Sequence, residues 1–142
     1  MPLRNPKVVD PNIVQSVSAI RTVDITMAST TYATLQSLSI TTTGSTNILI
    51  WISYCLSFST GVTNECRLRL QVDGTTILVS GEEEFTIAQS GAIVHRVAGA
   101  TAAAHTITLQ WRIGNTGEGT LRCRPATAPP EGVSIFAMEV SV

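Results

Sequence analysis

The chain has 142 residues, of which 44% are hydrophobic and only 13% are charged, and its formal net charge is −1. This length is enough for one ordinary domain with its own core, and the near-zero charge excludes the basic excess that nucleic-acid-binding proteins carry. Because so few charges leave a monomer with exposed apolar patches, we expect part of the surface to be covered by other chains.

The first sixteen residues differ in character from the rest. Pro2, Pro6 and Pro11 fix the backbone angle φ and remove amide donors, so this segment is neither a helix nor a good ladder strand. We therefore predict an extended N-terminal arm over residues 1–16 and a β domain over residues 17–142. The arm would lie either along its own domain or on a neighbouring chain, and both alternatives stay open.

Neither a secretory signal nor a membrane span is visible in the sequence. The start of the chain lacks the apolar run of a signal peptide, and no segment approaches the about 20 apolar residues that cross a bilayer. We therefore expect a protein made in a reducing cytosol and without a membrane partner.

From Val17 onward, apolar residues recur with a period of two, which is typical of strands that have one face on a core. A first strand is predicted over 17–27 and a second over 32–40, followed by a turn at Gly44. The longest predicted strand follows at 48–59.

The strand at 48–59 has one wholly apolar face, and we expect it to organise the fold. The apolar side chains at its even positions are Ile48, Ile50, Ile52, Tyr54, Leu56 and Phe58. The opposite face begins apolar, with Leu49 and Trp51, and then becomes polar. A strand with this pattern is central and covered on both sides for half its length, either by a second sheet or by a partner chain.

A hairpin is predicted next. Leu68 and Leu70 face the core from one side of a strand, while Arg67 and Arg69 leave its other side. The dipeptide Asp73-Gly74 matches the preferred two-residue hairpin turn, because both residues tolerate positive φ.

The second half of the chain contains two further core strands. The first is 105–113, where apolar and polar residues alternate without a break. The stretch 92–98 before it alternates only weakly, and its pattern does not show which side faces the core. The last strand, 133–142, is apolar on both faces, with Ile135 and Ala137 on one of them, and a strand of this kind is central.

These observations predict an all-β fold without helices. We count eight or nine strands joined by short turns, and a simple meander would leave the last strand on an edge. A two-sheet antiparallel sandwich with jelly-roll (Greek-key) topology accommodates a central last strand.

The sequence contains no catalytic or metal-binding constellation. His95 and His105 lie on different predicted elements and near no nucleophile motif, and an odd number of cysteines, Cys55, Cys66 and Cys123, without close spacing excludes a disulfide framework or a zinc ribbon. We therefore expect no enzymatic activity, no cofactor and no metal.

Two pairs of alternating arginines stand out, Arg67 with Arg69 and Arg122 with Arg124. Residues two apart on a strand leave the same face, so each pair forms a short cationic ladder. The ladders are either solvated faces with acidic cross-strand partners or interfaces for acidic groups of a partner protein.

The order of the strands resembles that of the small jelly-roll structural proteins of tailed bacteriophages, which are similar in build to the tumour-necrosis-factor-like heads. The resemblance covers about Val17 to Val142 and rests on the segments TGSTNILIWIS, RLRLQVDGTTI, HTITLQWRI and SIFAMEVSV. It implies a homotrimer in which aromatic and aliphatic side chains of one sheet meet at the axis.

The resemblance also implies a function, namely a capsid decoration (cement) protein on the virion exterior that binds the major capsid protein. The alternative is a tail-fibre or spike head that binds a host receptor or glycan. The residues expected to contact the capsid are Arg4, Lys7, Arg67, Arg69, Arg122 and Arg124. The residues expected at the subunit interface are Leu49, Trp51, Ile135 and Ala137.

Overall fold

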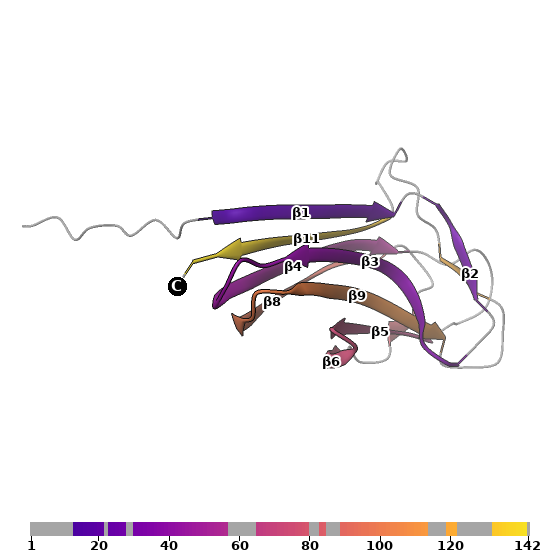
Figure 1. Cartoon of the computed structure of the whole chain (residues 1–142). Coiled ribbons are helices and arrows are strands. Elements are labelled where there is room, and N and C mark those ends of the chain that lie inside the picture. The colour runs from indigo at the N-terminus through magenta and orange to yellow at the C-terminus, as the bar shows by residue number, and fades with distance from the viewer. Residues whose placement is uncertain are drawn as a thin grey trace, which may run out of the picture.

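The computed structural model of the chain is all-β (Figure 1). It describes residues 13–21, 23–27, 30–56, 65–79, 83–84, 89–113, 119–121 and 132–141. No helix occurs in these ranges.

Two antiparallel sheets form the body of the molecule. The first sheet has four strands, in the order β1 (Ile13–Arg21), β11 (Gly132–Val140), β4 (Thr46–Leu56) and β8 (Gln89–Ala100). The second has five, in the order β3 (Ala33–Thr41), β9 (Ala104–Ile113), β5 (Glu65–Val72) and β6 (Thr75–Val79), with β7 (Glu83–Glu84) also paired to β5. A two-stranded sheet of β2 (Ile25–Met27) and β10 (Gly119–Leu121) lies at one end.

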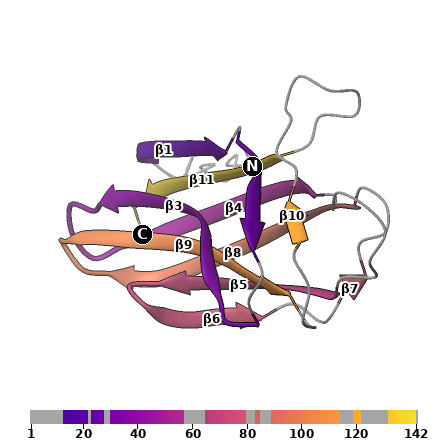
Figure 2. The same cartoon turned by 90° about the vertical axis from the view of Figure 1, so that its right-hand side faces the viewer.

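The eight longer strands follow the jelly-roll order. Counted along the chain, the first, eighth, third and sixth of them make the four-stranded sheet, and the second, seventh, fourth and fifth make the other. Consecutive strands therefore alternate between sheets except at the β5–β6 hairpin, and β11 is central, between β1 and β4. In Figure 2, β1 and β6 lie at opposite edges of the molecule. The predicted fold class is confirmed.

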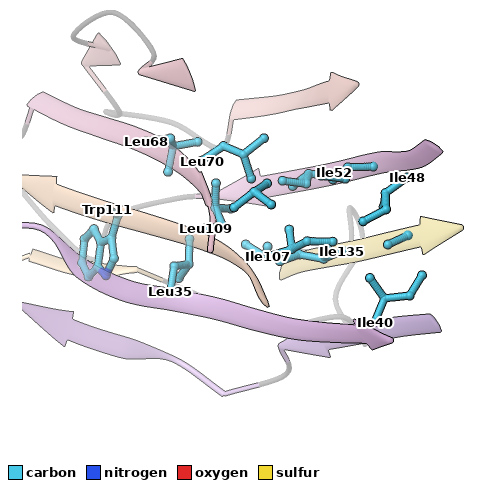
Figure 3. Close-up of a cluster of buried hydrophobic side chains, with 14 of the residues drawn as sticks. Leu35, Ile40, Ile48, Ile52, Leu68, Leu70, Ile107, Leu109, Trp111 and Ile135 are labelled. Atoms are coloured by element: carbon cyan, nitrogen blue, oxygen red, sulfur yellow. The ribbon is translucent and has the colours of Figure 1, made fainter. Parts of the chain in front are cut away.

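The core lies between the two sheets. Figure 3 shows side chains of both sheets, among them Ile48, Ile135, Leu70 and Leu109, pointing toward one another. Each of these four is fully buried, as is Trp111 at the end of β9. A fully buried aliphatic side chain stabilises the fold by about 1.5–3 kcal/mol. The apolar positions of the alternating pattern are therefore the residues whose burial contributes most to folding.

The predicted central strand and hairpin are both confirmed. Ile48, Ile50 and Ile52 of β4 have no exposed surface, and β4 pairs with a strand on either side. Asp73 and Gly74 have φ angles of 51° and 76°, the left-handed conformation that a two-residue hairpin turn requires.

One predicted boundary changes, and one undecided orientation is resolved. Strand β1 begins at Ile13, so residues 13–16, which we assigned to the arm, pair with β11, and residues 1–12 lie outside the described ranges. The undecided stretch 92–98 is the middle of β8, and its Ile93, His95 and Val97 face inward while Val94 is exposed.

Side chains of β1 close the gap between the sheet edges. β1 and β3 are edge strands of different sheets, and free carbonyls on such edges invite pairing with other chains. The Gln15 Nε2 donates a hydrogen bond to the Thr41 carbonyl, and Arg21 Nη1 donates one of 2.9 Å to the Leu35 carbonyl. Both acceptors belong to β3, so this edge of the sandwich is covered by side chains.

Candidate functional surfaces

The outer face of the four-stranded sheet carries exposed apolar side chains. Its centre is a row of three residues that lie opposite one another on neighbouring strands, Phe136 of β11, Trp51 of β4 and Val94 of β8. Trp51 is 56% exposed and Val94 is 66% exposed. We call the following six residues of this face the apolar band: Ile20, Leu49, Trp51, Val94, Phe136 and Met138.

The surroundings of the apolar band carry almost no charge. Serines and an alanine occupy most of its other positions, and a hydrogen bond of 2.6 Å between the hydroxyls of Ser53 and Ser134 joins β4 to β11. Within the described strands of this sheet, Arg96 is the one charged side chain that points outward. A flat, nearly uncharged face with an aromatic centre has the composition of a protein–protein interface core.

The structure corrects half of the predicted subunit interface. Trp51 and Leu49 lie on the outer face of the sheet, but Ile135 and Ala137 have no exposed surface and belong to the core between the sheets. Strand β11 is apolar on both sides, so alternation alone did not show which side points outward. The outward residues of β11 are Phe136 and Met138.

A cluster of arginines occupies the outer face of the other sheet. Arg67 of β5 lies directly opposite Arg112 of β9, and Arg69 lies opposite Gln110. The guanidinium carbon of Arg69 is 4.0 Å from the centroid of the Tyr32 ring, and that of Arg112 is 5.5 Å from it. We call Arg67, Arg69, Arg112 and Tyr32 the arginine cluster.

Hydrogen bonds hold two of these arginines in place. Arg69 donates from Nε, over 2.8 Å, and from Nη2 to the Oε1 of Gln110. Arg112 donates from Nη1 to the Thr30 carbonyl, 3.3 Å away. Stacking on an aromatic ring is a use for which arginine is favoured over lysine, so Arg69 and Arg112 are two cations held in defined positions.

The other predicted capsid contacts cannot be placed. Arg4, Lys7, Arg122 and Arg124 all lie outside the described residues. Of the six predicted positions, Arg67 and Arg69 therefore have a structural position, and the structure brings them together with Arg112 and Tyr32.

A buried carboxylate lies at the end of the sandwich where β3 turns into β4. Glu139 of β11 has no exposed surface. Its two oxygens accept hydrogen bonds from Gln15 Nε2 at 2.6 Å, from Thr43 N and Oγ1 at 2.8 and 2.9 Å, and from Thr46 Oγ1 at 2.9 Å. The hydrogen bond from Gln15, followed by that from the Thr43 amide, lowers the pKa of Glu139 to about 2. Glu139 is thus an ionised clamp between β1, β11 and this turn.

The same end holds a histidine–aspartate pair. His105 Nδ1 is 2.7 Å from Asp73 Oδ2, and His105 Nε2 is 3.0 Å from the Thr101 carbonyl. Both neighbours are acceptors, so both ring nitrogens donate when the imidazole is protonated. The hydrogen bond with Asp73 is the main cause that raises the pKa of His105, and the same bond lowers the pKa of Asp73.

Both titratable sites are engaged by hydrogen bonds within the fold. The carboxylate oxygens of Glu139 and both ring nitrogens of His105 have hydrogen-bond partners within the fold. In the part of the chain that the structure describes, no group of three metal-ligating side chains occurs. Neither Cys55 nor Cys66 forms a disulfide, and Cys123 lies outside the described residues. Within the described ranges, the structure contains no helix of the length and apolarity needed to span a membrane.

Sequence reasoning missed Glu139 and Arg112. Glu139 shares its strand face with Ile135 and Ala137, and this parity was the available sign of its burial. Arg112 alternates with Ile113 and Trp111, but its position opposite Arg67 depends on the pairing of β5 with β9, which no local pattern reveals.

The comparisons with known proteins show a fold and no family. No family model matches the sequence, and no curated protein matches it. A crystal structure of the infectious bursal disease virus VP2 subviral particle aligns with a TM-score of 0.52 at 10% identity, covering 89% of this chain and 39% of that chain. A crystal structure of dimeric latent PorU from Porphyromonas gingivalis aligns with a TM-score of 0.43 at 9% identity, covering 94% of this chain and 14% of that one. The likeness to the viral protein shows the sandwich fold, and this chain spans about two fifths of that protein's length.

Proposed function

We propose that the chain is a non-enzymatic structural protein of a virion, a bacteriophage capsid decoration protein that forms a homotrimer and binds the major capsid protein on the capsid exterior. The observation that carries the proposal is the apolar band, whose Trp51 is 56% exposed on an isolated chain. A jelly-roll fold shared with a viral subviral-particle protein supports the virion role.

The size of the face fits self-association. Four strands about 4.8 Å apart and about nine residues long cover roughly 20 by 30 Å, or about 600 Å² in plan. A stable interface buries about 800 Å² of accessible surface on each partner, and accessible area exceeds area in plan on a surface of protruding side chains. The face is therefore large enough to be one side of a specific subunit contact.

The subunit contact is tested by changing the apolar band. Trp51→Ser removes the large side chain at its centre and weakens association by about 2 kcal/mol, or roughly 30-fold, as for other central aromatic anchors. We expect light scattering to give three chain masses for the natural protein and mostly one for the variant at micromolar concentration.

Two valines of similar exposure provide a matched control. Val94 lies in the apolar band and is 66% exposed, whereas Val23 follows β1 outside the sheet and is 67% exposed. Val94→Ser should raise the fraction of monomer and Val23→Ser should not. A natural protein that stays monomeric at high concentration would contradict the homotrimer.

Capsid attachment is tested separately. The purified chain is mixed with empty capsids of the virus that encodes it, and the pellet is measured after sedimentation. The decoration role predicts saturable binding, while a trimer that leaves all capsids bare would overturn that role and leave the subunit contact standing.

A further inference from the structure

The arginine cluster places three cations on one sheet face. Arg67 and Arg112 are direct cross-strand partners, and like charges at such positions destabilise a sheet. Arg69 lies two residues from Arg67 on the same face. The cluster thus gathers three positive charges on one part of the face, which favours an interaction with a ligand of opposite charge.

The described residues do not neutralise Arg69 and Arg112. Their hydrogen-bond acceptors are the Gln110 side-chain oxygen and the Thr30 carbonyl, and no carboxylate within the described ranges forms an ion pair with either. The Nε of Arg112 is buried without an acceptor in this part of the chain. Both guanidinium groups are nevertheless held in place, so an anion would meet donors that lose little freedom on binding.

The spacing of the cations indicates the shape of the ligand. Arg112 lies two residues from Gln110, the cross-strand partner of Arg69, so Arg69 and Arg112 are offset by about 6.6 Å along the strands. An extended peptide repeats its own side chains on one side at the same interval. Planar guanidinium groups bind carboxylates through two parallel hydrogen bonds. The cluster therefore fits an extended segment that has acidic residues at alternate positions.

Nucleic acid fits this face less well. Arg69 stacks over the ring of Tyr32, so this aromatic face is not open to a base, and stacking on aromatic rings is a main source of affinity for single strands.

We infer that the arginine cluster is a binding site for an acidic, extended segment of a partner protein, with Arg69 and Arg112 pairing with carboxylates at alternate positions. The inference deepens the proposed function. The identification of the partner as a capsid protein rests on that proposed function. Carboxylate binding is measured on the isolated chain, so its failure and a failure of capsid attachment are distinguishable.

The probe is a labelled nine-residue peptide with glutamate at every second position and serine between, and its partner peptide has glutamine in place of each glutamate. Binding is followed by fluorescence anisotropy and by the NMR signals of the arginine Nε–H groups. We expect the glutamate peptide to bind, to shift the signals of Arg69 and Arg112, and to bind at least tenfold more tightly than the glutamine peptide.

Two variants that each remove one positive charge separate a site from general attraction. Arg112→Gln should weaken peptide binding at least tenfold. Arg96→Gln, on the exposed face of the opposite sheet, should weaken it less than twofold. Equal losses in the two variants would overturn the inference.

A third variant guards against misfolding as the cause. Arg69→Lys keeps the charge and loses the planar fork, so it should bind several-fold more weakly while its circular dichroism and melting curve stay unchanged. Undiminished binding by this variant would show that charge alone acts, which contradicts a guanidinium-specific site. Tighter binding of inorganic phosphate or of a single-stranded oligonucleotide than of the peptide would overturn the carboxylate assignment.

Discussion

Glu139 is held by hydrogen bonds from several elements of the fold. It is a carboxylate without exposed surface, and its hydrogen-bond donors come from β1, from the turn between β3 and β4, and from the start of β4. Removing one partner from a buried charged network leaves the other groups unsatisfied, which is among the most destabilising changes that a single substitution makes.

Acid should therefore weaken the protein through Glu139. Its pKa is lowered to about 2, so its stabilising contribution is complete above the ordinary glutamate pKa of about 4.3 and is lost as the pH falls toward 2. We expect the free energy of unfolding, measured by denaturant titration, to decrease over this window.

Glu139→Gln supplies the internal comparison. The variant should melt at least about 5 °C below the natural protein at pH 7, and the difference should shrink near pH 2, where the natural side chain is protonated as well. A difference in melting temperature that is the same at pH 7 and pH 2 would contradict this role of the ionised carboxylate.

At the scale of elements, the Asp73-Gly74 turn is attached to a neighbouring strand as well as to its own hairpin. The Asp73 Oδ1 accepts a hydrogen bond of 2.8 Å from the Thr106 amide, and the Asp73 amide donates one of 2.9 Å to the Thr106 carbonyl. Through His105, the turn is also linked to the carbonyl of Thr101, between β8 and β9. The Thr42 hydroxyl, in the turn between β3 and β4, donates to the same Thr101 carbonyl. Side chains therefore join the β3–β4, β5–β6 and β8–β9 turns at one end of the sandwich.

Alkaline conditions should loosen this end. The pKa of His105 is raised, so its contribution to stability is complete below the ordinary histidine pKa of about 6.5 and is lost as the pH rises through the raised value. Asp73, with a lowered pKa, contributes above about 3.9. The pair is thus strongest between about pH 4 and 6.5, and thermal unfolding should show a lower Tm at pH 9 than at pH 6.

The two histidines of the chain provide the control. His105→Gln should abolish most of the difference in Tm between pH 6 and pH 9, because glutamine does not titrate. His95→Gln, on β8 of the other sheet, should leave the difference in place. If His95→Gln abolished it instead, the alkaline loss would belong to a different site.

At the scale of the whole molecule, the sandwich separates two surfaces of different chemistry. The apolar band covers the outer face of one sheet, the arginine cluster covers the outer face of the other, and the hydrophobic core lies between them. Substitutions at well-separated sites without shared partners have additive effects.

The two surfaces should therefore respond independently. A Trp51→Ser/Arg112→Gln double variant should lose self-association as the first single variant does and peptide binding as the second does. Light scattering and anisotropy on the four proteins of this cycle measure the coupling. A peptide affinity that falls with Trp51→Ser alone would show that the cluster is complete only in the assembled form.

Period-two alternation was sufficient to locate most of the long strands and to identify β4 and β9 as core strands. It works because successive side chains of a strand point to opposite faces, so one buried face leaves a regular apolar pattern. The Asp73-Gly74 turn was equally legible, because the conformation it needs limits the residues that fit. The central position of β11 followed from its apolar pattern on both sides.

Alternation shows which residues of a strand share a face. When both faces are apolar, it does not show which face points toward the core. For this reason Ile135 and Ala137 were assigned outward, although Phe136 and Met138 hold that position. The partners of Glu139 were invisible for a different reason, since Thr43 is 96 positions away along the chain. The sequence alone thus determined which residues form strands and most of the core. The tertiary fold decided which strands are neighbours, because sheet pairing joins residues that no local pattern connects. It therefore also decided the apolar band, the arginine cluster and the Glu139 clamp.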